Sequence, residues 1–298
     1  MLQKNIPAPL CLKSPTIPRL VGQRGVTLIE LMVGIAIGML VVVVAMGALM
    51  VSRGVSGTVS DASGIQQQAA YAMRVIGLQV RQAGSLYLNP NPTNAASNNN
   101  LMAPVAFEAT APASGTGNSF DAVTDTLNGT VNPISLTVGY RRYKESVHTD
   151  AAEQALTRNC VAWPKNDSAD QRVESVFQLN GTELRCSGNG AAAQPIVQNV
   201  ANFQVRYLLQ DNTELGNTKI QYVEADSVDS WGKVQAVEVC LVLYGMEPID
   251  MPSGSNYTDC NGTAVDMTSL NGIRARRMHI TFRNVFQMRS QGLIGTVL

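Results

Sequence analysis

The stretch that decides the fold of this 298-residue chain is Gly25-Val-Thr-Leu-Ile-Glu30, together with the apolar run that continues to Val51. Glu30 is the one charged residue between Leu28 and Val51. A helix over these residues, at ~1.5 Å per residue, spans ~36 Å and exceeds the ~30 Å hydrocarbon core of a bilayer. A carboxylate in such a segment is costly to bury, so Glu30 is a candidate functional residue.

The position of the small residue next to Arg24 separates this segment from an ordinary secretory signal. Such a signal has a shorter apolar core, and its cleavage site follows that core. Here the candidate site, Gly25, precedes the apolar run, so cleavage leaves the helix on the mature chain. The alternative is an ordinary signal anchor that tolerates one glutamate.

The hexamer and the twenty or so apolar residues after it resemble the class III signal of type IV pilins and type II secretion pseudopilins. The resemblance implies that a prepilin peptidase cuts between Gly25 and Val26 and methylates the new amine of Val26. Phe is more common in the family at the position of Val26. The resemblance also implies that the apolar run packs against helices of other subunits, beginning with Leu28, Ile29, Leu31 and Met32.

Glu30 has a physical reason to set the register of an assembly. Val26 and Glu30 lie four residues apart, about one helical turn, so the new amine and the carboxylate sit at similar depth. Pairing Glu30 with the amine of a neighbouring subunit relieves the burial cost of both charges. We therefore expect Glu30 to fix the axial position of each subunit.

The segments on either side of the cleavage site differ in charge. Residues 1–25 carry four cations and no acid, a bias that keeps this end cytoplasmic, and their prolines exclude a long helix. Loss of this leader, which includes Cys11, leaves a mature chain of net charge about −4, which argues against nucleic-acid binding. We expect a cleaved leader over 1–25, a long helix over 26–84 and an extracytoplasmic, β-rich head over 85–298.

The helix is predicted to continue well beyond the apolar run and to stop at Gly84. Apolar residues recur every three or four positions, which marks one face of a helix. They are Val55, Val59, Ala62, Ile65, Ala69, Met73, Ile76 and Val80. Most polar side chains fall off this stripe, namely Gln66, Gln67, Arg74, Gln79 and Arg81.

The remainder of the chain reads as loops and short alternating strands. Loop-rich stretches cover 88–100 and 109–119, and a short helix is possible over 145–157. Strands are expected over 134–140, 203–209, 234–243 and 277–283, with a hairpin over 173–185 that turns at Asn180-Gly181. The expected fold class is α+β, with one long helix packed on an antiparallel sheet.

Cysteine usage indicates an exported head. Four cysteines follow the leader and allow three pairings. We favour Cys160–Cys186 and Cys240–Cys260 because each closes a local loop. A four-thiolate zinc site is the competing reading, but no C-x-x-C spacing supports it. Disulfides place the head in an oxidising compartment.

Residues for catalysis or for metal binding are sparse. The two histidines, His148 and His279, are far apart, and His279 falls on the polar face of a predicted strand, where a surface position is expected. No hydrolase, nucleotide-binding or metalloprotease motif is present. Three aspartates in a loop-rich stretch lack the spacing of calcium ligands: Asp250, Asp259 and Asp266. We expect no enzyme, no cofactor and no metal.

Three later segments resemble PilW-type minor pilins: residues 195–207, 234–243 and 276–284. The first is also similar to J-type pseudopilins. The resemblance implies a minor pilin in the inner membrane, with its head in the periplasm until assembly. It implies as partners the prepilin peptidase, membrane lipid, the major pilin and other minor pilins of a tip complex that primes assembly, with a pilus-tip adhesin possible; nucleic acid is not expected.

Two other functions stay open from the sequence. One is a J-type minor pseudopilin of a type II secretion system, which neighbouring genes would separate from a minor pilin. The other is a signal-anchored binding module, which predicts no cleavage before Val26 and no dependence on Glu30.

Overall fold

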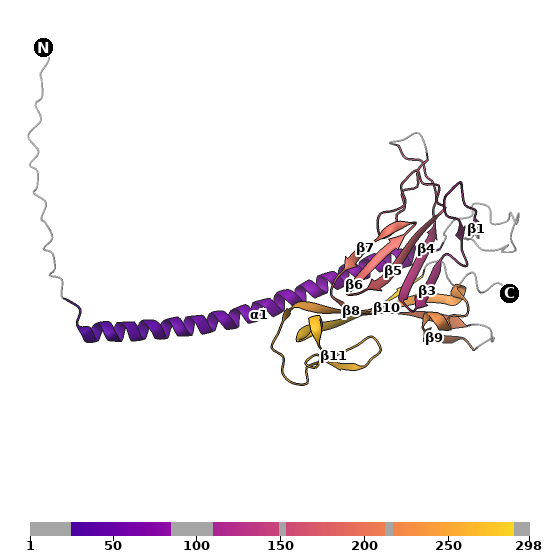
Figure 1. Ribbon diagram of the computed structural model, residues 1–298. Helices are drawn as coiled ribbons and strands as arrows, with labels where there is room; N and C mark the ends of the chain where they lie inside the picture. Colours follow the sequence, from indigo (N-terminus) through magenta and orange to yellow (C-terminus); the bar gives the residue numbers. More distant parts are fainter. Residues whose placement is uncertain (1–24, 85–109, 149–152, 212–216, 289–298) are drawn as a thin grey trace, which may run out of the picture. The chain divides into compact units, whose positions relative to one another are not determined.

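The computed structural model describes residues 25–84, 110–148, 153–211 and 217–288, drawn in colour in Figure 1. The predicted leader and the loop over 88–100 lie outside these residues. The chain divides into two compact units, residues 1–53 and residues 54–298, and each is described by itself.

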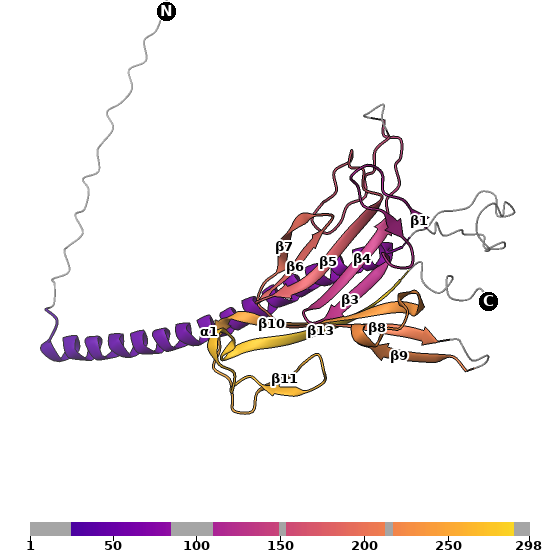
Figure 2. The ribbon, with the colours of Figure 1, turned by 45° about the vertical axis from the view of Figure 1, so that its right-hand side comes forward.

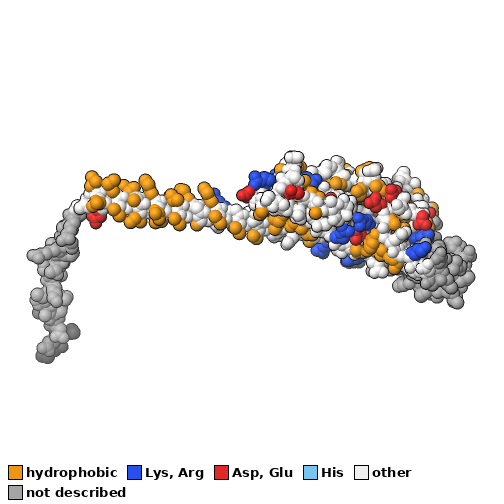
Figure 3. All heavy atoms as spheres, turned by 90° about the horizontal axis from the view of Figure 1, so that it is seen from below, with side chains coloured by type: hydrophobic (Ala, Val, Ile, Leu, Met, Phe, Trp, Pro, Cys, Tyr) orange, Lys and Arg blue, Asp and Glu red, His pale blue; other side chains and the backbone are white. Residues whose placement is uncertain are grey.

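Helix α1 (Leu28–Gln82) is 55 residues long, and its first part dominates the first unit. Its apolar side chains are exposed throughout residues 28–51, as the orange surface in Figure 3 shows. By length and composition this helix is able to cross a membrane. Alanine and long aliphatic residues favour the helix, whereas three glycines in the run, at Gly34, Gly38 and Gly47, weaken it locally.

The head contains a four-stranded antiparallel sheet in the order β13-β10-β8-β9. Its strands are β8 (Val200–Asp211), β9 (Lys219–Val223), β10 (Val234–Pro248) and β13 (Arg277–Gln287). β10 is the strand with the longest apolar run, and it lies in the interior of the sheet. Both of its faces are buried from Ala236 to Gly245, which explains why its sequence does not alternate.

A second antiparallel sheet has five strands in sequential order, β3-β4-β5-β6-β7. They are β3 (Leu127–Val131), β4 (Ile134–Arg141), β5 (Arg172–Asn180), β6 (Glu183–Gly188) and β7 (Ala191–Val197). β5 and β6 alternate between buried and half-buried side chains, as a sheet with one face on the core requires. The chain then passes from β7 directly into β8 of the four-stranded sheet (Figure 2).

One hydrophobic core joins the second part of α1 to both sheets. The helix contributes its predicted stripe from Ile65 to Val80. The five-stranded sheet contributes Leu136 and Phe177, and the four-stranded sheet contributes Phe203 and Leu241. Val55 and Val59 of the predicted stripe are exposed instead, because no other described part of the second unit covers them.

Shorter elements lie outside the two sheets. They are the pair β1 (Thr110–Ala111) and β2 (Phe120–Asp121), the pair β11 (Asn256–Thr258) and β12 (Ala264–Asp266), and the 3-10 turns η1 (Ala225–Ser227), η2 (Trp231–Lys233) and η3 (Gly272–Arg274). The chain between β10 and β13, residues 249–276, forms an excursion that adds a second hydrophobic cluster. Tyr257 and Cys260, which lie within the excursion, pack on Cys240 and Val242 of β10 and form this cluster.

Two local predictions need correction. The hairpin turn is one residue later than expected, because Asn180 pairs with Glu183 and leaves Gly181 and Thr182 as the turn. Gly181 has φ +61°, a conformation that glycine adopts without steric cost. The described residues of 145–157 form no helix; the backbone of Glu145 instead exchanges two hydrogen bonds of 2.9 Å with Gln154.

Candidate assembly site

The start of α1 is built as a capping box around Glu30. The backbone N–H of Glu30 donates to Thr27 Oγ1 at 3.3 Å, and the backbone N–H of Thr27 donates to Glu30 Oε2 at 3.4 Å. This reciprocal arrangement satisfies two donors that the first helical turn leaves without a partner. The signal for it, Thr-x-x-Glu, is present in the sequence, and our reading of the hexamer missed it.

The residues around the capping box present an open apolar surface. Val26 is 70 % exposed, and the four predicted packing residues range from 58 to 76 % exposed. Those residues are Leu28, Ile29, Leu31 and Met32. Gly25 has open space around it, as do the three glycines of the apolar run. The first unit therefore offers a helix whose apolar side chains have no partner within the described residues of that unit.

The second part of α1 is held to the head by polar contacts as well as by the core. Asp61 accepts a hydrogen bond of 2.9 Å from the backbone N–H of Met246, at the end of β10. Gly245 lies so close to this carboxylate that a Cβ at that position would overlap it. Less than one turn before the helix ends, Gln79 is buried, although the sequence predicts it off the core stripe. It accepts a hydrogen bond of 2.9 Å from Ser175.

The cysteines form two disulfides, Cys160–Cys186 and Cys240–Cys260, with Cα–Cα distances of 6.3 and 5.7 Å. These are the two pairings that close local loops. The first joins the loop before β5 to β6. Beside it, the Ser175 hydroxyl oxygen accepts a hydrogen bond from the Cys160 N–H. The second ties β10 to the excursion that contains Tyr257.

His279 is buried, so its predicted surface position is wrong. It is 5 % exposed and stacks on Tyr257 with a centroid distance of 4.7 Å. Its Nδ1 donates to the carbonyl oxygen of Arg277 at 2.8 Å, whereas Nε2 is buried without a hydrogen-bond partner in the described part of the chain. Burial lowers the pKa of His279 below its ordinary value of 6.5. The polar face of β13 is thus covered by the excursion between β10 and β13.

The three aspartates considered for calcium have separate structural partners. Asp250 pairs with Arg276, Asp259 accepts a hydrogen bond from Asn202, and Asp266 accepts one from Thr268. Within the described residues, no group of three or more potential metal ligands is present.

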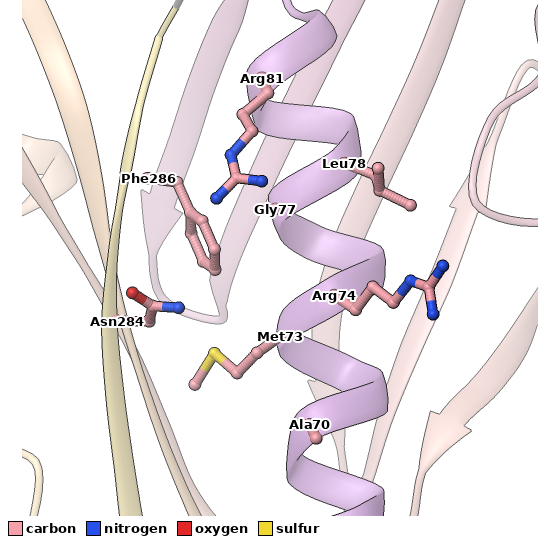
Figure 4. A pocket seen from close by; sticks show the side chains of 8 residues that line it. All are labelled: Ala70, Met73, Arg74, Gly77, Leu78, Arg81, Asn284 and Phe286. Atoms are coloured by element: carbon pink, nitrogen blue, oxygen red, sulfur yellow. The ribbon is translucent and has the colours of Figure 1, made fainter.

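A groove of about 430 Å³ lies between α1 and β13 in the head (Figure 4). Ala70 and Gly77 of α1 lie along it, and Phe286 and Asn284 of β13 line its other side. The Arg81 guanidinium lies 5.8 Å from the centroid of the Phe286 ring. Arg74, Met73 and Leu78 complete the lining. No sequence signal predicted this groove, because its two walls are more than 200 residues apart.

Comparison with known proteins gives two family matches. Residues 166–290 match the family model described as Type IV Pilus-assembly protein W, and residues 21–46 match the prokaryotic N-terminal methylation motif. The first match spans β5 to β13, and the second spans the hexamer and the start of α1. No curated protein sequence matches this chain.

Among solved structures, the chain is similar to a type IV-like pilin from Thermus thermophilus. The two share 13 % sequence identity with a TM-score of 0.37, over 75 % of this chain and 95 % of the other. The fold assignment itself rests on the long apolar helix and the antiparallel sheets described above. The N-terminal methylation motif and the match of the head to the Type IV Pilus-assembly protein W model together support a type IV pilin of the PilW type.

Proposed function

We propose that this chain is a minor pilin that joins a tip complex and primes the polymerisation of a type IV pilus. The observation that carries the proposal is the first part of α1, an exposed apolar helix. Its one carboxylate, Glu30, lies in the capping box at the N-terminal end of the helix. Such a surface is stable in lipid before assembly and against other pilin helices afterwards. The head stays outside the cytoplasm in both states, in agreement with its two disulfides.

Glu30 sets the register of the subunit in this proposal. Before assembly the carboxylate is occupied by its own helix terminus, through Thr27. In the assembly, the amine that cleavage creates on Val26 of a neighbouring subunit supplies a positive charge to it. The ion pair relieves the cost of both charges in an apolar surrounding, so a subunit out of register is disfavoured.

The first test is the N-terminal sequence and intact mass of the membrane-extracted chain, from cells with and without a prepilin peptidase. We expect a peptidase-dependent chain that begins at Val26 and is heavier by one methyl group. An intact leader, or a cut after the apolar run that ends at Val51, would contradict the pilin assignment and favour a signal-anchored module.

A second test separates a pilus subunit from a J-type pseudopilin. Deletion of the chain is expected to abolish surface pili while leaving protein export through type II secretion unchanged. The opposite pattern would assign the chain to a secretion pseudopilus. Short pili at normal number would contradict the priming role and leave the family assignment intact.

A further inference from the structure

We propose that the head binds a second copy of this chain, with the edge at β9 of one copy docked on the α1–β13 groove of the next. The contact is head to tail, because β13 and β9 are the two opposite edges of the four-stranded sheet. The inference goes beyond the proposed function: it concerns contact between heads and depends on neither cleavage nor Glu30.

The groove side of this contact is cationic and apolar. From Ala62 to Gln82 the helix carries no acidic residue, and Arg74 and Arg81 are exposed on the face that borders the groove. They lie seven residues apart, two helical turns or ~10 Å along the axis. Leu78, between them, is 47 % exposed. Among the described residues, neither arginine has an ion-pair partner.

The wall that β13 supplies is an open sheet edge. The Met288 N–H donates to the Gln235 carbonyl of β10 at 2.9 Å, and in an antiparallel pair such bonds recur at every second residue. The backbone groups of Val285 and Gln287 therefore point away from β10. Among the described residues, the side chain of Asn284 accepts the hydrogen bond of the Val285 N–H, at 2.9 Å, and Val285 is 43 % exposed. An edge of this kind is a template for another chain.

The other edge of the same sheet has the complementary chemistry. β9 is exposed from Lys219 to Tyr222, and its large apolar residues, Ile220 and Tyr222, are 65 % and 47 % exposed. Both lie on one face of the strand, two residues apart. Glu224 and Asp226 follow directly and are exposed, without an ion-pair partner among the described residues. β9 thus presents two exposed apolar side chains, and two exposed carboxylates follow it.

The two edges match in apolar surface and in the charges of Arg74, Arg81, Glu224 and Asp226, but not at Lys219, the exposed cation that begins β9. The small residue Ala70 leaves room for an apolar side chain of β9, whereas the Phe286 ring already fills the space at Gly77. Arg74 and Arg81 provide cations for the carboxylates that follow β9. Because the two surfaces are different patches of one molecule, the contact does not close on itself in a dimer. It adds copies in one direction, as a subunit of a filament does.

Charge reversal tests this contact on the full-length chain in detergent, with mass measured by light scattering over a range of concentrations. Variant A is Arg74→Glu with Arg81→Glu, and variant B is Glu224→Arg with Asp226→Arg. The wild type is expected to associate progressively with concentration, and less so at ~1 M salt, where the charges are screened. Each variant alone is expected to lose at least tenfold in association, because like charges then meet.

A mixture of variants A and B provides the decisive readout. In the mixture, the acidic groove of variant A meets the basic β9 edge of variant B. The unchanged β9 edge of A likewise meets the unchanged groove of B, so association is expected to return. A matched control, Lys144→Glu with Lys165→Glu, changes net charge as variant A does at exposed positions away from both edges and is expected to associate like the wild type. Circular dichroism of every variant checks the fold.

Three outcomes would overturn the proposal: a wild type that stays monomeric, single variants that associate normally, or a mixture that does not recover. None of them bears on the proposed function, which is tested by cleavage at Gly25 and by surface pili. Conversely, loss of pili with normal association in detergent would leave the head-to-tail contact standing.

Discussion

Gly245 is a residue whose identity is imposed by a distant side chain. It lies against Asp61 of α1, which accepts hydrogen bonds from the backbone after Gly245. We predict that Gly245→Ala destabilises the head by about 1–3 kcal/mol, because the added methyl group forces the carboxylate away. Chemical denaturation measures the change. Gly232→Ala is the control, since a methyl group there meets nothing closer than 3.8 Å, and an equal cost at both positions would contradict the explanation.

His279 gives the head a predictable response to acid. Its pKa is lowered by burial, so the unfolded chain binds a proton at His279 more readily than the folded chain does. The neutral ring's contribution to stability is therefore complete above about pH 6.5 and is lost as the pH falls towards the lowered pKa. Two charged groups also act on this pKa: Arg274 lowers it and Asp259 raises it.

We predict that His279→Phe flattens the dependence of unfolding free energy on pH below about pH 6.5. Phe keeps an aromatic ring between Tyr244 and Tyr257 and removes the titrating nitrogen. The measurement is denaturant unfolding at a series of pH values. His148→Gln serves as the comparison because His148 is exposed; a slope that disappears in that variant instead would show that His279 is not responsible.

At the scale of elements, one guanidinium holds a long connection in place. Arg142, directly after β4, is 2 % exposed and donates to five backbone carbonyl oxygens in residues 155–170, at distances of up to 3.2 Å. The described residues of this connection form no helix or strand, so their carbonyl groups need this partner. Arg142 therefore supplies the hydrogen-bond donors that backbone N–H groups supply within a helix or a sheet.

We predict that Arg142→Met lowers the free energy of unfolding by about 2–4 kcal/mol and exposes residues 153–171 to protease, because buried carbonyl groups lose their donor. Limited proteolysis followed by mass spectrometry locates the cuts. Lys144→Met, two residues further on and exposed, is expected to change neither quantity. Cleavage of both variants at the same rate would argue against the role of Arg142.

At the scale of the molecule, the capping box separates two possible roles of Glu30. Thr27→Val removes the cap and keeps the carboxylate, whereas Glu30→Gln removes the charge and keeps an acceptor for the Thr27 N–H. We predict that Glu30→Gln reduces incorporation into sheared pili at least tenfold and that Thr27→Val reduces it less than threefold, because the neighbour's amine needs the charge. Immunoblots of sheared pili measure incorporation, and N-terminal sequencing verifies processing. Equal losses in both variants would assign Glu30 to capping alone.

The sequence by itself determined every feature that depends on local order or periodicity. The long helix, its apolar first part, the charge at Glu30 and most strands follow from residue spacing, because backbone geometry repeats every 3.6 or two residues. Burial of particular side chains was decided only by the tertiary structure. His279 is buried because an excursion that includes Tyr257 covers its face of β13, and Gln79 is buried because Ser175 meets it from another sheet. The groove at Gly77 exists because β13 returns to a helix some 200 residues earlier. Each of these contacts joins segments that are far apart in the sequence, so no local sequence pattern encodes it.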